Sequence, residues 1–95
     1  MMRVIDPIMS EAVQMALGLA RRGFRGRIAG IEVVPTASDL PAEELERRLI
    51  ELGFIEGAEV EVLHEGLFGR DPIAVRVNDA TIAIRRREAM AIFVS

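Results

Sequence analysis

The chain has 95 residues, 51% of them hydrophobic, and a formal net charge of −3, which suits one small domain with a thin core and not a disordered chain. The negative charge argues against nucleic-acid binding through the overall field, and the absence of cysteine excludes disulfides, thiolate metal sites and cysteine nucleophiles. No apolar run approaches the roughly 20 residues of a membrane span and the N-terminus is not a secretory signal, so we expect a cytoplasmic protein without membrane insertion.

Residues 1–18 have the pattern of an amphipathic helix. Asp6 can cap the helix, Pro7 fits its first position, and apolar residues then recur at spacings of three and four. We interpret residues 1–16 as an N-terminal helical extension packed on the domain; the alternatives are a helix that docks a partner and a partly ordered extension. Residues 17–95 are predicted to form the main domain.

A glycine- and arginine-rich segment then leads into a strand predicted over residues 27–34, which Pro35 ends. Gly30 interrupts the alternation of this strand and indicates a β-bulge. The segment carries a basic cluster, made up of Arg21, Arg22, Arg25 and Arg27. We interpret the cluster as a solvated loop, with contact to phosphate or lipid headgroups as the alternative. It is not a phosphate loop, because no phosphate-binding glycine spacing accompanies it.

A helix is predicted from Pro41, with Glu43 and Glu44 in the first turn, where they favour the helix dipole. Its apolar stripe consists of Leu45, Leu49 and Leu52. Gly53 would end the helix, and Gly57 marks a turn that leads into the next strand.

Three short strands with tight turns follow. The first, over residues 58–65, would place Val60, Val62 and His64 on one face and Glu61 on the other. The remaining predicted elements are a loop over residues 66–71, a strand from Pro72 to Val77, a two-residue turn at Asn78-Asp79, a strand over residues 80–84, a helical turn over residues 85–90 and a strand over residues 92–94. This spacing predicts a mostly β fold with short helices, closed into a small barrel.

The ordered motifs of the chain resemble the FeoA family, small cytosolic proteins of bacterial ferrous iron transport. The resemblance covers about residues 17–94 and rests on Gly26 with residues 28–31, Arg48-Leu49, Leu52-Gly53-Phe54, Gly57, Asp71-Pro72-Ile73, Ile84-Arg85, Glu88-Ala89, Ile92 and Val94. It implies an SH3-like barrel. The chain departs from the family pattern at Glu56, where proline is common, at Arg70, which lengthens the connection to Asp71, and over residues 1–14, which have no counterpart.

From this resemblance we expect a non-catalytic accessory protein that binds and modulates the membrane transporter FeoB, with the cytosolic G-protein domain as the target. The alternative is a metal-responsive regulatory domain, because the same barrel is appended to iron-dependent repressors of the DtxR type. The residues themselves support no catalytic site, since one histidine and scattered carboxylates form neither an acid–base pair nor a Ser-His-Asp set. The oligomeric state is left open.

The predicted partner-binding surface is the loop that carries Leu67, Phe68, Gly69 and Arg70. Two large apolar residues at a glycine-bounded tip either fold back over a barrel end or form an exposed anchor for a partner. Structural roles are expected for Gly53, Gly57, Asp71, Pro72 and Arg85, with Asp71 bracing its own loop.

The arginines at positions 85–87 are interpreted as a solvated face, with an ion pair to an acidic partner as the alternative. No cofactor is expected. The weak candidates for a divalent ion, Fe²⁺ or Mn²⁺, are His64 and Glu61. A half-buried histidine in the barrel wall is favoured, because strict alternation would place Glu61 on the opposite face.

Overall fold

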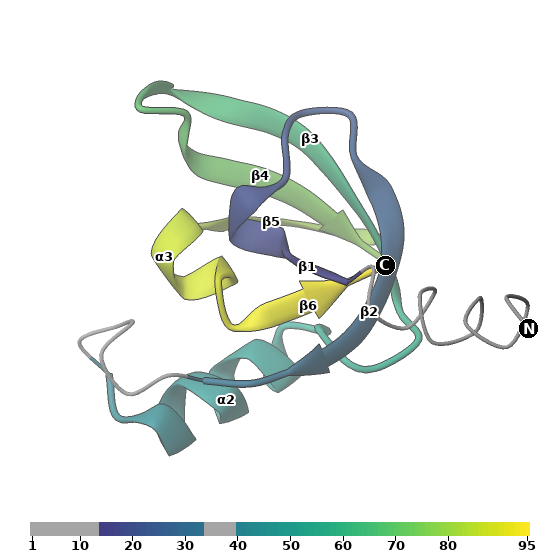
Figure 1. Ribbon diagram of the computed structural model, residues 1–95, viewed down its shortest axis with the longest axis vertical. Helices are drawn as coiled ribbons and strands as arrows, with labels where there is room; N and C mark the ends of the chain where they lie inside the picture. Colours follow the sequence, from purple (N-terminus) through teal and green to yellow (C-terminus); the bar gives the residue numbers. More distant parts are fainter. Residues whose placement is uncertain (1–13, 34–39) are drawn as a thin grey trace, which may run out of the picture.

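The fold is that of a computed structural model, in which residues 14–33 and 40–95 are described (Figure 1). Its elements are β1 (Met15–Ala16), the 3₁₀-helix η2 (Leu17–Leu19), β2 (Arg25–Ile31), α2 (Ala42–Glu51), β3 (Glu59–Phe68), β4 (Asp71–Val77), β5 (Ala80–Ile84), α3 (Arg86–Ala89) and β6 (Ile92–Val94). The prediction of a mostly β fold with short helices is confirmed. No helix in these ranges is long and apolar enough to span a bilayer.

The six strands form one sheet in the order β1-β6-β2-β3-β4-β5, and every pair in it is antiparallel. Strand β2 turns the sheet, because its first half pairs with β3 and its second half with β6. A register shift between Ile28 and Gly30 lies within the part that pairs with β6, so the bulge predicted at Gly30 is confirmed. The sheet has two ends, β1 and β5, and is therefore not the closed ring of paired strands that we predicted.

The predicted N-terminal helix falls mostly on residues 1–13, which lie outside the described ranges. Its expected last part is wrong, because Met15 and Ala16 form strand β1 against Val94 and Phe93. The edge of β6 offers backbone hydrogen bonds to these two residues, and that tertiary pairing overrides the local helical pattern. The strand predicted over residues 27–34 begins earlier, at Arg25, and ends at Ile31.

Helix α2 covers the core with Leu45 and Leu49, which are 0% and 1% exposed. Its end is a Schellman motif: the N–H of Gly53 donates to Ile50 O (2.9 Å) and the N–H of Phe54 donates to Leu49 O (3.0 Å). Gly53 has a φ of 108° and Phe54 is fully buried directly after it. The predicted helix end is confirmed. The motif turns the chain from α2 towards β3 and places an aromatic ring in the core.

Figure 1 shows the hairpin of β3 and β4 at one end of the molecule and α2 at the other. The predicted strands of residues 80–84 and 92–94 are confirmed as β5 and β6, and the predicted helical turn contains α3. The turn at Asn78-Asp79 is also confirmed, since Val77 pairs with Ala80 across it. The body of the fold therefore presents one long hairpin, and the candidate site lies at its tip.

Candidate functional site

The connection between β3 and β4 is a two-residue turn. Gly69 and Arg70 occupy it with φ values of 68° and 59°, and Phe68 pairs with Asp71 on either side. Positive φ at both central residues is the pattern of a type I′ turn, whose twist matches that of the flanking strands. The predicted loop over residues 66–71 is therefore wrong: the two strands continue almost to the tip.

Two bulges in β3 decide which way its side chains point. The strand has one extra residue relative to β4 between Val62 and His64, and another between Glu65 and Phe68. Each extra residue reverses the alternation of inward and outward side chains. His64 is consequently exposed, while Glu65 is half-buried. The prediction of a half-buried histidine is wrong because strict alternation does not continue past Val62.

Leu67 and Phe68 are exposed at the tip, with relative accessibilities of 93% and 88%. We predicted that these two side chains either fold back over a barrel end or are exposed. The structure shows that they are exposed. Gly69 and Arg70 are exposed beside them. The hairpin thus presents two large apolar side chains that no other described residue covers, which is typical of an anchor for another surface.

Arg86 links the turn end of the hairpin to the N-terminal part of the domain. Its Nε donates to Arg70 O (2.7 Å), and its Nη1 donates to the carbonyl oxygens of Gly18 (3.0 Å) and Ala20 (2.7 Å). Its Nη2 pairs with Glu65 Oε2 at 2.7 Å, and these two side chains are only 18% and 17% exposed. One guanidinium therefore joins α3, the hairpin and η2, which makes the position of the tip a fixed property of the fold.

We predicted a solvated face over residues 85–87, and this prediction is wrong for Arg86. Arg85 and Arg87 are exposed, but Arg86 is half-buried and satisfied by protein groups. The sequence analysis did not identify Arg86 as the residue that holds the hairpin in position. Its neighbours in the chain are also arginines, and nothing local distinguishes it. The only available signal was its position directly after the family motif at Ile84-Arg85.

Asp71 braces the start of α3, not its own loop. Its Oδ1 accepts a hydrogen bond from the backbone N–H of Arg86 (2.9 Å), and its Oδ2 lies 3.9 Å from Arg85 Nη1. The peptide bond between Asp71 and Pro72 is cis. Glu65 is also contacted by Arg21, whose Nε lies 3.5 Å from Glu65 Oε2. The carboxylates of Glu65 and Asp71, near the turn of the hairpin, are therefore both neutralised by arginines.

The turn end of the hairpin is basic. It carries or contacts four arginines, at positions 21, 70, 85 and 86, against the carboxylates of Glu65 and Asp71. Three of the arginines are exposed. Since the whole chain has a net charge of −3, this end differs in sign from the rest of the molecule. An apolar pair with arginines around it suits a partner surface with an apolar pocket and an acidic rim.

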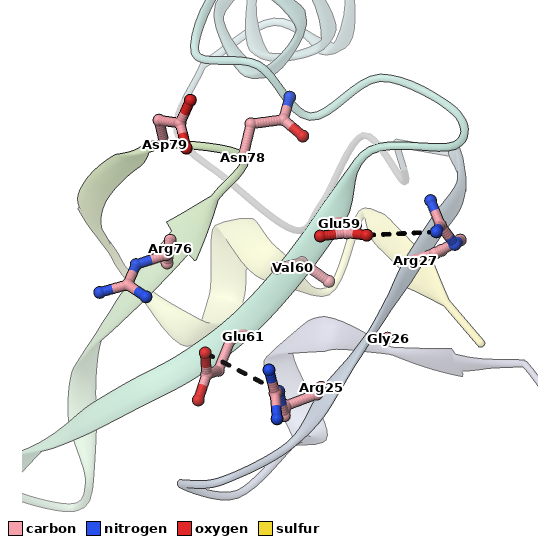
Figure 2. A pocket seen from close by; sticks show the side chains of 9 residues that line it. All are labelled: Arg25, Gly26, Arg27, Glu59, Val60, Glu61, Arg76, Asn78 and Asp79. Atoms are coloured by element: carbon pink, nitrogen blue, oxygen red, sulfur yellow. Dashed lines mark hydrogen bonds and ion pairs between the residues drawn. The ribbon is translucent and has the colours of Figure 1, made fainter.

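A second surface feature is an open groove of about 420 Å³ along β2, β3 and β4 (Figure 2). Two cross-strand ion pairs line it, Arg25 with Glu61 (3.9 Å) and Arg27 with Glu59 (3.2 Å). Arg27 also donates to Gly57 O (2.9 Å). Both arginines lie in strand β2: the predicted strand already began at Arg27, whereas the expectation of a solvated loop is wrong for Arg25. Because the charges pair with one another, the groove is a weaker candidate than the tip.

The weak metal candidates, His64 and Glu61, lie on the same strand, and Glu61 forms the ion pair with Arg25. Within residues 14–33 and 40–95, no three His, Cys, Asp or Glu side chains are grouped as metal ligands. Of the residues expected to have structural roles, Gly53 and Gly57 have positive φ, and Asp71 and Pro72 are joined by the cis peptide bond. Gly57 has a φ of 90°, and its N–H donates to Ile28 O (2.8 Å).

Comparison with known proteins gives a family match. The family model for the FeoA domain matches residues 15–95. No curated protein matches the sequence significantly. Among solved structures, a FeoA protein from Chlorobium tepidum is 32% identical with a TM-score of 0.68, over 84% of this chain and 68% of that chain.

Two further structures are informative. Stenotrophomonas maltophilia FeoA, described as a prokaryotic SH3 domain protein in complex with zinc, is 28% identical with a TM-score of 0.69, over 85% of this chain and 89% of that one. A manganese-dependent transcriptional repressor is 26% identical with a TM-score of 0.67, over 86% of this chain but 41% of its own. The predicted SH3-like character of the fold is consistent with these neighbours.

Proposed function

The chain belongs to the FeoA family, and from that membership we propose that it is an accessory protein of ferrous iron transport that binds the cytosolic G-protein domain of a FeoB-type transporter. The proposal makes the β3–β4 tip the contact surface. The single observation that carries it is the exposure of Leu67 and Phe68, at 93% and 88%, on a hairpin held in place by Arg86.

The geometry of the tip supports a protein-binding role. Apolar side chains at the centre of an interface account for much of the binding energy, while charged groups at its rim set orientation and association rate. The tip offers both elements, because exposed Arg21, Arg70 and Arg85 surround the apolar pair. The hairpin is also pre-organised, since Arg86 bonds Arg70 O from outside the hairpin. Little conformational entropy would be lost when a partner binds.

Calorimetry with the cognate G domain tests this proposal. Binding by the wild-type protein should weaken at least about 30-fold in the double variant Leu67→Asp with Phe68→Asp, since truncating hot-spot residues costs about 2 kcal/mol or more. Ile55→Asp is the matched control, because Ile55 is an exposed apolar residue (50%) near the opposite end of β3. Equal affinity of the double variant and the wild type would show that the tip is not the contact surface.

The second candidate function is metal-responsive regulation. It is supported by the likeness to the manganese-dependent repressor, although the chain spans only 41% of the length of that protein. Titration with Mn²⁺ or anaerobic Fe²⁺, followed by calorimetry, tests this function. If a site uses His64, then His64→Ala should weaken binding at least about tenfold, as expected for loss of a ligand. Unchanged binding in this variant would remove His64 from the site.

A further inference from the structure

Strand β5 is an end strand of the sheet that the described residues form. It pairs with β4 on one side, and within residues 14–33 and 40–95 no strand pairs with its other edge. Its sequence, Ala-Thr-Ile-Ala-Ile, contains neither charge nor proline. Natural edge strands are usually blunted by charges, proline or bulges, because an open row of backbone groups pairs with other chains. The β4–β5 ladder also runs without a register shift, so this edge is regular.

The backbone groups on this edge can be assigned from the turn. Val77 pairs with Ala80 across the two-residue turn, and such a closing pair exchanges its hydrogen bonds within the hairpin. The pattern alternates, so Ala80, Ile82 and Ile84 bond to β4, whereas the N–H and C=O of Thr81 and Ala83 point to the free edge. Within the described ranges these two residues have no other backbone partner. Both are exposed.

The edge is self-complementary. In an antiparallel two-fold pairing centred on Ile82, Thr81 lies opposite Ala83 of a second copy, and the free groups of both residues meet. This arrangement forms four backbone hydrogen bonds. The same register sets Asp79 opposite Arg85 at both ends of the paired segment. Arg85 has an extended backbone that continues β5, and its side chain is 64% exposed.

The charges select this register among the possible ones. Asp79 is exposed and forms no ion pair with any residue in the described part of the chain. Arg85 has only a long contact of 3.9 Å, to Asp71. Shifting the centre to Thr81 or Ala83 would still pair outward backbone groups, but it would separate Asp79 from Arg85. Opposite charges across paired strands stabilise the pairing.

We propose that β5 is a self-association surface, through which two copies of this chain join their sheets in an antiparallel pair centred on Ile82. The proposal is independent of the transporter as partner. The hairpin tips with Leu67 and Phe68 extend beyond the paired segment of β4, which ends at Ile73, and remain free for other contacts; Arg85 alone would take part in both surfaces. The paired strand is short, so the interface lies below the ~1,200 Å² of standard interfaces and the dimer is weak and concentration-dependent.

Sedimentation velocity on the full chain, from micromolar to millimolar concentration, is the first test. The wild type should shift from monomer to dimer, and Thr81→Pro should remain monomeric. Proline at this position removes only an outward N–H, so the hairpin keeps its hydrogen bonds. Ala83→Lys places a charge on the edge and should have the same effect, which covers the case in which the proline variant does not fold. A wild type that stays monomeric throughout would overturn the proposal.

Cross-linking tests the register. The wild-type chain contains no cysteine, so introduced thiols are unambiguous. Oxidation of a mixture of Thr81→Cys and Ala83→Cys proteins should give the mixed disulfide dimer in clear excess over either homodimer. Comparable homodimer yields would reject the register centred on Ile82.

Charge exchange is an independent test of the same register. Asp79→Arg should weaken dimerisation about threefold to tenfold, since each of the two exposed ion pairs contributes several tenths of a kcal/mol. Combining it with Arg85→Asp should restore the association. No restoration in a folded double variant would show that these residues do not face each other. Capture of an extended peptide from another protein at this edge, with no self-association, would also refute the proposal.

Discussion

At the scale of single residues, Gly53 shows how one backbone conformation ends a helix. Its φ of 108° lies in the region that side chains rarely adopt, and an added Cβ would lie 3.5 Å from Val77. Gly53→Ala should therefore lower the free energy of unfolding by about 1 kcal/mol, as measured by urea denaturation. Gly30→Ala is the matched control, because φ there is not positive and no atom lies within 4 Å of the added Cβ. Equal losses in both variants would contradict the role assigned to Gly53.

Arg86 is the residue on which the candidate site most depends. Replacing it with methionine keeps the aliphatic contacts but leaves Glu65 half-buried without its 2.7 Å partner and frees three carbonyl oxygens. We expect a loss of about 2–4 kcal/mol in unfolding free energy, a large fraction of the stability of a small domain. Arg22→Met serves as the control, because Arg22 is exposed. Its free energy of unfolding should change by less than about 0.5 kcal/mol.

At the scale of elements, the β3–β4 hairpin contains one position that admits only glycine. A Cβ on Gly66 would overlap the carbonyl oxygen of Asp71 at the second bulge. Gly66→Ala should therefore distort the hairpin above this point and increase amide hydrogen exchange there, while the exchange of β2 and β6 stays slow. Unchanged protection across the hairpin would show that the bulge can accommodate the added Cβ without loss of strand pairing.

Replacing the turn residue Arg70 should have opposite effects on the free energy of unfolding and on the affinity for the proposed partner. It has a φ of 59°, which a residue with a side chain adopts at a penalty of about 1 kcal/mol. Arg70→Gly should raise the free energy of unfolding by about 0.5–1 kcal/mol while weakening partner binding through loss of the charge. Arg70→Ala separates the two effects. It removes the charge but keeps the strained backbone, so it should weaken binding without the gain in stability.

At the scale of the whole molecule, charge is distributed unevenly. The chain carries a net charge of −3, yet the turn end of the β3–β4 hairpin presents exposed Arg21, Arg70 and Arg85. Association with an acidic partner surface should therefore slow as salt is added, because screening shortens the range of the attraction. Stopped-flow measurements at low and physiological ionic strength would show the fall in association rate. In the proposed complex the dissociation rate depends mainly on Leu67 and Phe68, so it should change much less.

The sequence by itself determined what depends on local pattern. Glycine after an apolar stripe predicted the end of α2, a two-residue signal predicted the turn at Asn78-Asp79, and alternation predicted β5 and β6. The ordered motifs identified the family over nearly the whole described chain. The apolar pair at positions 67 and 68 stood out in the sequence as a candidate anchor, because large apolar residues are unusual at a turn.

Only the tertiary structure decided the features that depend on pairing between distant segments. The bulges in β3 follow from its fit against β4, and they turned His64 outward and Glu65 inward. The segment at Met15 became a strand because the edge of β6 lies beside it. Arg86 was distinguished from its arginine neighbours by carbonyl groups 16 to 68 residues away in the chain. Local periodicity carries no information about partners at that separation, because only the folded chain brings them together.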